Sequence, residues 1–210
     1  MKLMLIRHAS PAEKVRGRCY GTLDVGLSDA GRRECDALVT ALAGERLAAI
    51  VSSPATRAVA TASPLAAAHG LGVEVLDGLR ELDFGALEGR TYDEIAFSMP
   101  ELYEQWMTAP TSVRFPGGEG YDDLRRRVQA TVEACRSAYD GRLVAAVTHG
   151  GVVRALVAGV LEIPPERIFR LAVNHASVTV VEWVGGEPTV RELNRRPLGM
   201  QLRARPRFDA

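Results

Sequence analysis

The sequence predicts a three-layer α/β/α sandwich in which a mainly parallel central sheet carries an antiparallel edge strand. Short apolar runs of strand length alternate with longer helical patterns along most of the chain, an order typical of parallel sheets covered by helices. Near the C-terminus, two β-rich runs flank a Gly-Gly pair, which predicts an antiparallel hairpin. No repeat and no linker interrupts this order, so we expect residues 1–210 to form a single domain.

The N-terminal half alternates apolar runs with capped helical patterns. Residues 2–6 are short, apolar and followed by a polar pair, which indicates a buried strand. The polar, glycine-containing residues 9–27 form a loop, after which Ser28 is a typical N-cap for a helix that ends near Gly44. The next expected elements are a strand over 47–52, a helix over 55–69 that starts after Pro54, and a strand over 73–76.

The C-terminal half begins with a different composition. Residues 91–120 are rich in aromatic side chains and carry three prolines, which predicts one or two short helices followed by a loop. Residues 121–139 carry an apolar stripe at helical spacing and form a long helix. The basic tail from about 195 to 210 contains two prolines, and we expect it to be loosely ordered. The remaining expected elements are a strand over 143–147, a helix over 150–161, and a hairpin of 178–184 with 189–193.

Composition excludes several classes of partner. Lysine plus arginine equals aspartate plus glutamate at 26 residues each, which argues against a nucleic-acid binder or a protein of anionic membranes. The three cysteines are widely spaced and odd in number, a usage typical of reduced thiols in the cytoplasm. No apolar run approaches a membrane span, and the N-terminal run is too short for a secretory signal. We therefore expect a cytoplasmic protein without membrane or nucleic-acid partners, and both a monomer and a homodimer remain open.

Four short segments carry the side chains that a phosphate-handling site needs. Arg7 and His8 follow the first expected strand, His149 follows a central one, Arg57 opens a helix, and Glu81 lies in the segment RELDFGALEG. In parallel α/β sheets the ligand site lies beyond the carboxyl ends of the strands, where two of these segments are expected. Two guanidinium groups, two imidazoles and one carboxylic acid are the groups required to attack a phosphate ester with a histidine nucleophile.

The residue types indicate roles within such a site. A neutral imidazole at His8 can attack phosphorus and form a phosphohistidine. Arg7 and Arg57 can hold phosphoryl oxygens with their fixed forks of donors, and the N–H groups at the start of the helix that carries Arg57 would face the same anion. A protonated His149 would add a third positive donor, and Gly150 after it would let the backbone approach a ligand.

Spacing alone does not select the acid that protonates the leaving oxygen. Glu81, Asp83 and Glu88 share one short segment, and the apolar side chains around Glu81 favour the neutral form of a carboxyl group. The three candidates therefore stay open at this point. The two other histidines are interpreted as structural, because His69 precedes the glycine that ends a helix and His175 lies in a loop before the final hairpin.

Taken together, these segments resemble the histidine phosphatase superfamily, also called phosphoglycerate mutase-like, over nearly the whole chain. The resemblance implies phosphoryl transfer through a phosphohistidine with no metal ion or other cofactor. It also selects Glu81 over Asp83 as the acid, and it assigns catalytic roles to Arg7, His8, Arg57, Glu81 and His149. The matching blocks are LIRHA, GRCYGTLDVGLSDAGRREC, SSPATRAVATA, RELDFGALEG, FPGGEGYDDLRRRV and VTHGGVVRAL.

Details of the blocks narrow the resemblance. The block GRCYGTLDVGL looks most like the α-ribazole phosphatase-like and broad-specificity phosphatase branch. Ala9 stands where the family usually has a glycine after its nucleophile, and its methyl group would narrow the pocket. Lys14 stands where mutases have an asparagine, and this departure argues against mutase activity.

The implied function is hydrolysis of a small-molecule phosphate ester, with His8 as nucleophile, Glu81 as acid, and Arg7, Arg57, His149 and Gly150 around the phosphate. Lys14, Cys19, Tyr20 and Gly21 would line the mouth of the pocket. The aromatic segment 92–116 would either form a partial lid or simply pack on the sheet.

Three alternatives remain. The first is phosphoglycerate mutase-type phosphoryl transfer, and the second is a binding module that holds phosphate without catalysis. The third is a metal hydrolase that uses His8, His149 and Glu81, although the sequence has no compact ligand motif such as H-E-x-x-H.

Overall fold

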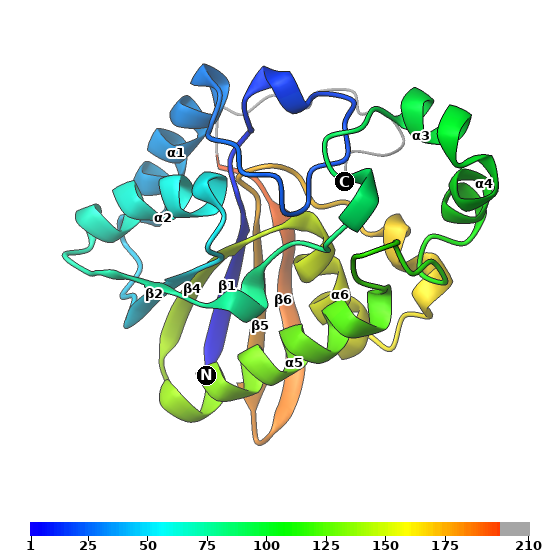
Figure 1. Cartoon of the computed structure of the whole chain (residues 1–210). Coiled ribbons are helices and arrows are strands. Elements are labelled where there is room, and N and C mark those ends of the chain that lie inside the picture. The colour runs from blue at the N-terminus through cyan, green and yellow to red at the C-terminus, as the bar shows by residue number, and fades with distance from the viewer. Residues whose placement is uncertain (198–210) are drawn as a thin grey trace.

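A computed structural model of the chain describes residues 1–197 and contains a six-stranded sheet between layers of helices (Figure 1). The strands are β1 (Lys2–Arg7), β2 (Ala49–Ser52), β3 (Val73–Val75), β4 (Leu143–Thr148), β5 (Val178–Val184) and β6 (Glu187–Arg195). Their order across the sheet is β3-β2-β4-β1-β5-β6. The first four strands in this order are parallel, whereas β5 runs antiparallel to both β1 and β6. The predicted fold class is confirmed, and its antiparallel edge consists of two strands.

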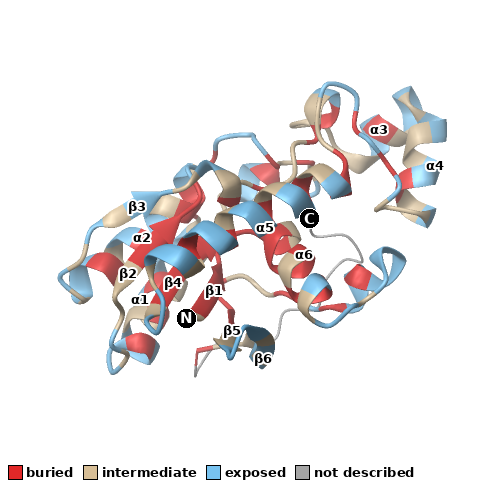
Figure 2. Cartoon of the chain, turned by 90° about the horizontal axis from the view of Figure 1, so that it is seen from below, coloured by how far each residue is buried: buried red, intermediate tan, exposed pale blue. Residues whose placement is uncertain are grey.

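Helices cover both faces of the sheet. On one face lie α1 (Asp29–Leu42) and α2 (Thr56–Ala68), and on the other lie α5 (Tyr121–Ala138) and α6 (Gly150–Val160). The side chains of β1 alternate between the two layers, because successive residues of a strand point to opposite faces. Leu3 and Leu5 pack under α5 and α6, whereas Met4 and Ile6 pack under α1 and α2. Figure 2 shows the buried strands in the middle of these layers.

Besides the hydrophobic clusters on the two faces of the sheet, a third, smaller one lies under α3 (Tyr92–Ser98) and α4 (Pro100–Thr108). These two helices correspond to the short helices expected in residues 91–120. The rings of Phe84, Trp106 and Phe115 meet there with centroids 5.0–5.6 Å apart. Tilted and edge-to-face pairs at this spacing stabilise aromatic cores. The aromatic segment is therefore packed against its own small core. Up to residue 197, the structure also contains four short 3-10 helices: η1 (Glu13–Val15), η2 (Asp77–Leu79), η3 (Gly85–Leu87) and η4 (Pro165–Arg170).

Most of the expected elements are present with small shifts of their ends. The Ser28 side chain accepts a hydrogen bond from the Gly31 N–H at 3.0 Å, as its predicted N-cap role requires. The strand expected from residue 47 begins at Ala49, and the last strand extends to Arg195. Most of the expected loose tail, residues 198–210, lies outside the described residues. Within residues 1–197, no helix is both long and apolar enough to cross a bilayer.

Candidate active site

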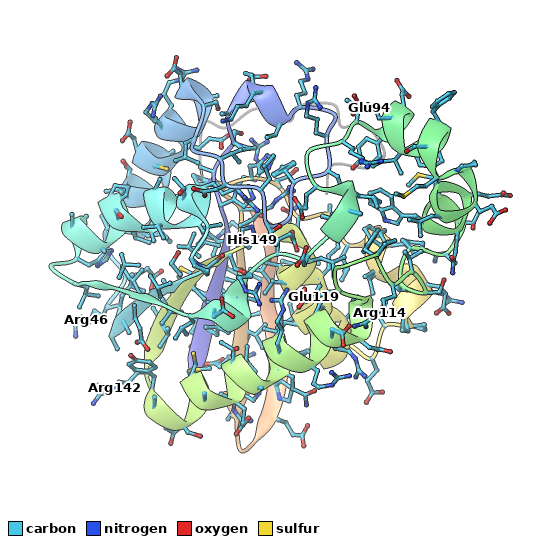
Figure 3. The ribbon with its side chains drawn as sticks, viewed as in Figure 1. Arg46, Glu94, Arg114, Glu119, Arg142 and His149 are labelled. Atoms are coloured by element: carbon cyan, nitrogen blue, oxygen red, sulfur yellow. The ribbon has the colours of Figure 1, made fainter. Side chains whose placement is uncertain are left out.

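Strand register brings three segments of the site side by side. Arg7 and Thr148 are partners at the ends of β1 and β4, and the His8 N–H donates to the Thr148 carbonyl at 2.8 Å. Ser53 follows β2, which pairs with the other side of β4. His8, Ser53 and His149 thus leave three neighbouring strands at the carboxyl edge of the sheet, and Figure 3 shows His149 near the middle of the molecule.

One tautomer of His8 is held by the backbone. The ring Nδ1 lies 2.8 Å from the Ala9 carbonyl oxygen, and since a carbonyl can only accept, Nδ1 carries the hydrogen and Nε2 keeps its lone pair. Burial, followed by the charges of Arg57 and Arg7, holds the pKa of His8 well below its usual 6.5. The ring is therefore neutral at pH 7, which is the form that attacks phosphorus.

Arg7 and Arg57 are almost completely withdrawn from solvent, with 1% and 0% of their surfaces exposed. Arg7 Nη1 donates to the Val173 carbonyl at 2.7 Å. A Cβ atom at Gly150 would lie 3.1 Å from Arg154 Nη1 and at an ordinary contact distance of 3.4 Å from the Arg7 Cζ atom. Gly150 therefore allows the close approach of the Arg154 side chain, and the structure shows no comparable requirement from Arg7.

The Arg57 guanidinium connects α2 to the loop over residues 20–23. Nη1 donates to the Leu23 carbonyl at 3.0 Å, and Nη2 donates to the Gly21 carbonyl at 2.7 Å and to the His149 Nδ1 at 3.3 Å. Arg57 Nε is buried and has no hydrogen-bond partner within residues 1–197. A buried donor of this kind requires an acceptor, and a bound anion would supply one.

The start of α2 differs from the expectation. The Thr56 N–H donates to Asp24 Oδ1 at 3.1 Å, and the Thr56 hydroxyl donates to Asp24 Oδ2 at 2.8 Å. The first N–H of this helix is thus satisfied by an internal carboxylate rather than by a ligand. Arg57 must therefore act through its side chain, because this carboxylate also offsets the positive end of the helix dipole.

Without a bound anion, His149 is held in its neutral form. Burial and then Arg57, His8 and Arg7 lower the pKa of His149 well below 6.5, so this ring is neutral at pH 7. Because the Arg57 guanidinium can only donate, His149 Nδ1 accepts and Nε2 carries the hydrogen that faces Ser53 Oγ at 2.7 Å.

The carboxylate of Glu81 lies at the start of α6, beside the His149 segment. Glu81 Oε2 accepts from the Gly151 N–H at 3.0 Å, and Oε1 accepts from the Leu82 N–H at 2.9 Å. Glu81 is buried, with 6% of its surface exposed. From α5, Arg127 donates to the Glu81 carbonyl at 2.8 Å and pairs with Glu119, which fixes the backbone that carries Glu81.

Asp83 and Glu88, the two competing carboxyl groups, stabilise backbone turns. Asp83 Oδ1 accepts from the Gly85 N–H at 2.8 Å. The Glu88 carboxylate accepts from four backbone N–H groups, those of residues 21, 22, 23 and 84. Glu88 thus holds the loop whose carbonyls receive Arg57. Within residues 1–197, no group of three or more His, Cys, Asp or Glu side chains could hold a metal ion.

Three of the residues expected at the mouth, Lys14, Tyr20 and Gly21, differ from one another in exposure and in contacts. Lys14 is exposed in η1, and Tyr20 is half-buried with its ring centroid 5.2 Å from the Arg57 Cζ atom, in cation–π contact. Gly21 is buried, and a Cβ atom there would lie 1.8 Å from the Leu82 carbonyl oxygen. Gly21 is therefore required for the contact between two loops rather than for lining the pocket.

Two expectations about small side chains are wrong. Cys19 is fully buried in the aromatic cluster with Phe84 and Trp106, so its thiol does not lie at the mouth. Ala9 has no positive φ, and its methyl group is buried in the cluster beneath α1 and α2. The methyl group therefore contributes to the core and does not narrow the pocket.

His175 lies against the candidate nucleophile, although its sequence context indicated a structural role. Its ring centroid is 5.2 Å from that of His8, with the ring planes inclined at 44°. The cause is topological: β5 runs antiparallel to β1, so the segment that enters β5 lies beside the end of β1 that carries His8. The predicted strand over 178–184 could have indicated this position only if its neighbour in the sheet were known.

Comparison with known proteins shows which family the chain matches. The model of the histidine phosphatase superfamily (branch 1) matches residues 3–196. A bifunctional protein of Mycobacterium tuberculosis is 36% identical over 196 residues, which are 92% of this chain and 54% of that protein. The chain thus spans about half the length of these mycobacterial relatives.

Two further relatives match over 92% and 100% of their own length. Phosphoserine phosphatase 1 of Hydrogenobacter thermophilus is 30% identical over 194 residues, which are 92% of each chain. The crystal structure of the α-ribazole phosphatase from Shigella flexneri aligns with a TM-score of 0.85 at 25% identity, covering 96% of this chain and 100% of that one.

Proposed function

Because the chain belongs to the histidine phosphatase superfamily, we propose that it is a phosphatase that hydrolyses small-molecule phosphate esters through a phosphohistidine at His8, without a metal ion. Two of its relatives, from H. thermophilus and S. flexneri, are named phosphatases, which favours transfer of the phosphoryl group to water over a mutase reaction. The observation that carries the proposal is the neutral His8 ring, with its Nε2 lone pair, beside two buried guanidinium groups.

The buried charges of the site suit a phosphate monoester dianion. At the site, the buried charged side chains are those of Arg7, Arg57 and Glu81. Buried charge is unfavourable unless it is compensated. A dianion would place negative charge beside two buried guanidinium groups and would give Arg57 Nε an acceptor.

The first chemical step would transfer the phosphoryl group to His8. Nε2 attacks phosphorus as the bond from phosphorus to the ester oxygen breaks, and Arg7, Arg57 and His149 surround the phosphoryl oxygens. The arriving negative charge favours the protonated form of His149, which would add a third positive charge beside the phosphoryl oxygens.

Glu81 would serve both steps as the proton carrier. Its carboxyl group gives a proton to the leaving oxygen, which departs as an alcohol. The resulting carboxylate then takes a proton from the water that attacks the phosphohistidine, and inorganic phosphate leaves. The hydrogen bonds to Glu81 from Gly151 and Leu82 hold the carboxylate in place for both transfers.

Rapid quench with a labelled phosphate ester tests this mechanism. We expect an acid-labile, alkali-stable phosphoenzyme in the full chain and release of inorganic phosphate that persists in a chelator. His8→Ala should abolish the label and lower kcat by roughly a thousandfold or more, as for other lost nucleophiles. The matched control His69→Ala, at the end of α2, should retain both. Label on serine or cysteine, or activity restored only by a divalent ion, would overturn the proposal.

A further inference from the structure

The ring of His8 contacts two other imidazoles. The His149 centroid lies 5.1 Å from that of His8 with the planes at 63°, and the His175 centroid lies 5.2 Å away with the planes at 44°. The hydrogen bond from His8 Nδ1 to the Ala9 carbonyl fixes one atom of the ring but leaves rotation about that contact. Contact with neighbouring rings restricts this rotation, because a tilt of His8 would drive its edge into them.

The segment that carries His175 is bound tightly to the end of β1. The Ala176 N–H lies 3.0 Å from the Arg7 carbonyl and 3.3 Å from the His8 carbonyl, and the Arg7 N–H donates to the Ser177 carbonyl at 3.1 Å. Because these bonds join the backbone of His8 to that of the residue after His175, the two imidazoles are held in a defined relative position.

Backbone strain in the same segment supports a specific role. Ala176 is fully buried and has a φ of 51°, in the left-handed region that favours glycine. Asn194 on β6 also has a positive φ of 55°, and its Oδ1 accepts from the Asn174 N–H at 2.6 Å. Strained non-glycine residues cost on the order of 1–3 kcal/mol and gather at functional sites. The strained Ala176 backbone directly after His175 is consistent with a requirement for this ring position.

We propose that His175 is a positioning residue that fixes the ring plane of His8 for attack on phosphorus. The proposal rests on the proposed nucleophilic role of His8. Nucleophilic attack requires the reacting atoms to be aligned, and a misplacement of about 1 Å can cost on the order of 100-fold in rate. In this role the flat ring of His175 restrains His8 by contact, and its nitrogen atoms take no part.

Variants at residue 175 separate ring contact from hydrogen bonding. His175→Ala should slow phosphoenzyme formation by roughly 10- to 100-fold in single-turnover experiments, because His8 can then tilt. Binding of inorganic phosphate should be unchanged, since the two arginines remain. His175→Asn, which keeps a polar group but loses the ring, should behave like His175→Ala, whereas His175→Phe should restore most of the rate.

Imidazole NMR signals provide a readout that a purely structural role would not move. His175→Ala should broaden the His8 signal, beyond the shift caused by loss of the neighbouring ring current, because the freed ring samples several orientations; the His69 signal should stay in place. A native phosphorylation rate in His175→Ala would overturn the inference. A native rate in His175→Asn would also overturn it, and this arm applies even if the phenylalanine variant fails to fold. If His8→Ala retains activity, the proposed function itself fails. If the His175 variants keep a native rate but His8→Ala does not, the role of His175 fails and the proposed function stands.

Discussion

Replacement of Gly151 by alanine should lower activity while leaving the stability of the fold almost unchanged. A Cβ atom at this position would lie 2.3 Å from Glu81 Oε1 and 3.4 Å from Leu124 Cδ2. To reach even 3.0 Å, the Glu81 carboxylate would have to retreat by about 0.7 Å, and this movement would break or lengthen its bond to the Gly151 N–H. A shift of this size costs on the order of 10- to 100-fold when the displaced group takes part in the reaction.

The effect should depend on the leaving group. An alkyl phosphate needs a proton on its departing oxygen, whereas p-nitrophenolate leaves readily without one. Single-turnover phosphorylation of the Gly151→Ala enzyme should therefore slow for an alkyl phosphate and change much less for p-nitrophenyl phosphate. Glu81→Gln, which removes the transferable proton, should slow phosphorylation by the alkyl substrate about 10²–10⁴-fold and so sets the lowest rate to be expected.

Gly159 provides a matched control in the same helix. A Cβ atom there would meet nothing within 4 Å. Gly159→Ala should therefore stabilise the protein by about 0.5–1 kcal/mol, the usual gain for alanine over glycine inside a helix, with unchanged kinetics. In Gly151→Ala the same gain in helix stability offsets part of the destabilisation that the close contact with Glu81 causes, so Tm should change little. A native rate of alkyl phosphate cleavage in Gly151→Ala would refute the reasoning, because Glu81 would not need its observed position.

Two further predictions concern the charged and titratable groups of the pocket. Because burial lowers the pKa of both His8 and His149, the unfolded chain takes up protons near pH 6.5 while the folded chain does not. The free energy of unfolding should therefore decrease as pH falls below about 6.5, by up to about 1.4 kcal/mol per pH unit for each ring. Urea unfolding at a series of pH values should show this slope, and His149→Asn should remove about half of it; an equal slope in the variant would contradict the assignment. Separately, Arg57→Lys keeps the charge but loses the fork of donors, and should lose about 2–4 kcal/mol of transition-state stabilisation in kcat/KM. Arg46→Lys, at the periphery in Figure 3, is the control, and a near-native Arg57→Lys enzyme would show that the fork is not required.

The choice among the candidate acids shows where sequence reasoning stops. Glu81, Asp83 and Glu88 occupy one short segment and have the same chemistry, so spacing cannot rank them. In the structure, Glu88 accepts N–H groups from a loop more than sixty residues earlier, and Asp83 closes a local turn. Only Glu81 reaches the start of α6. Glu81 and Glu88 are thus distinguished by partners that are distant in the chain.

The histidines give a second example. The position of His8 at a strand end follows from a local pattern of apolar residues, which the sequence displays directly. The contact of His175 with His8 depends on the antiparallel pairing of β5 with β1. The neutral state of His149 depends on burial and on Arg57, which comes from another helix. The contact of His175 and the protonation state of His149 therefore have no local signature in the sequence.

The sequence by itself determined the alternation of strands and helices, the fold class, and the placement of Arg7, His8 and His149 at the ends of strands. It could do so because strand and helix periodicity, caps and glycine positions depend on neighbours a few residues away. Only the tertiary structure showed that Glu81 reaches the start of α6 while Asp83 and Glu88 hold turns, that Cys19 belongs to the core, and that His175 contacts His8. These outcomes follow from strand order and from packing between distant segments, which set burial, hydrogen-bond partners and pKa shifts together.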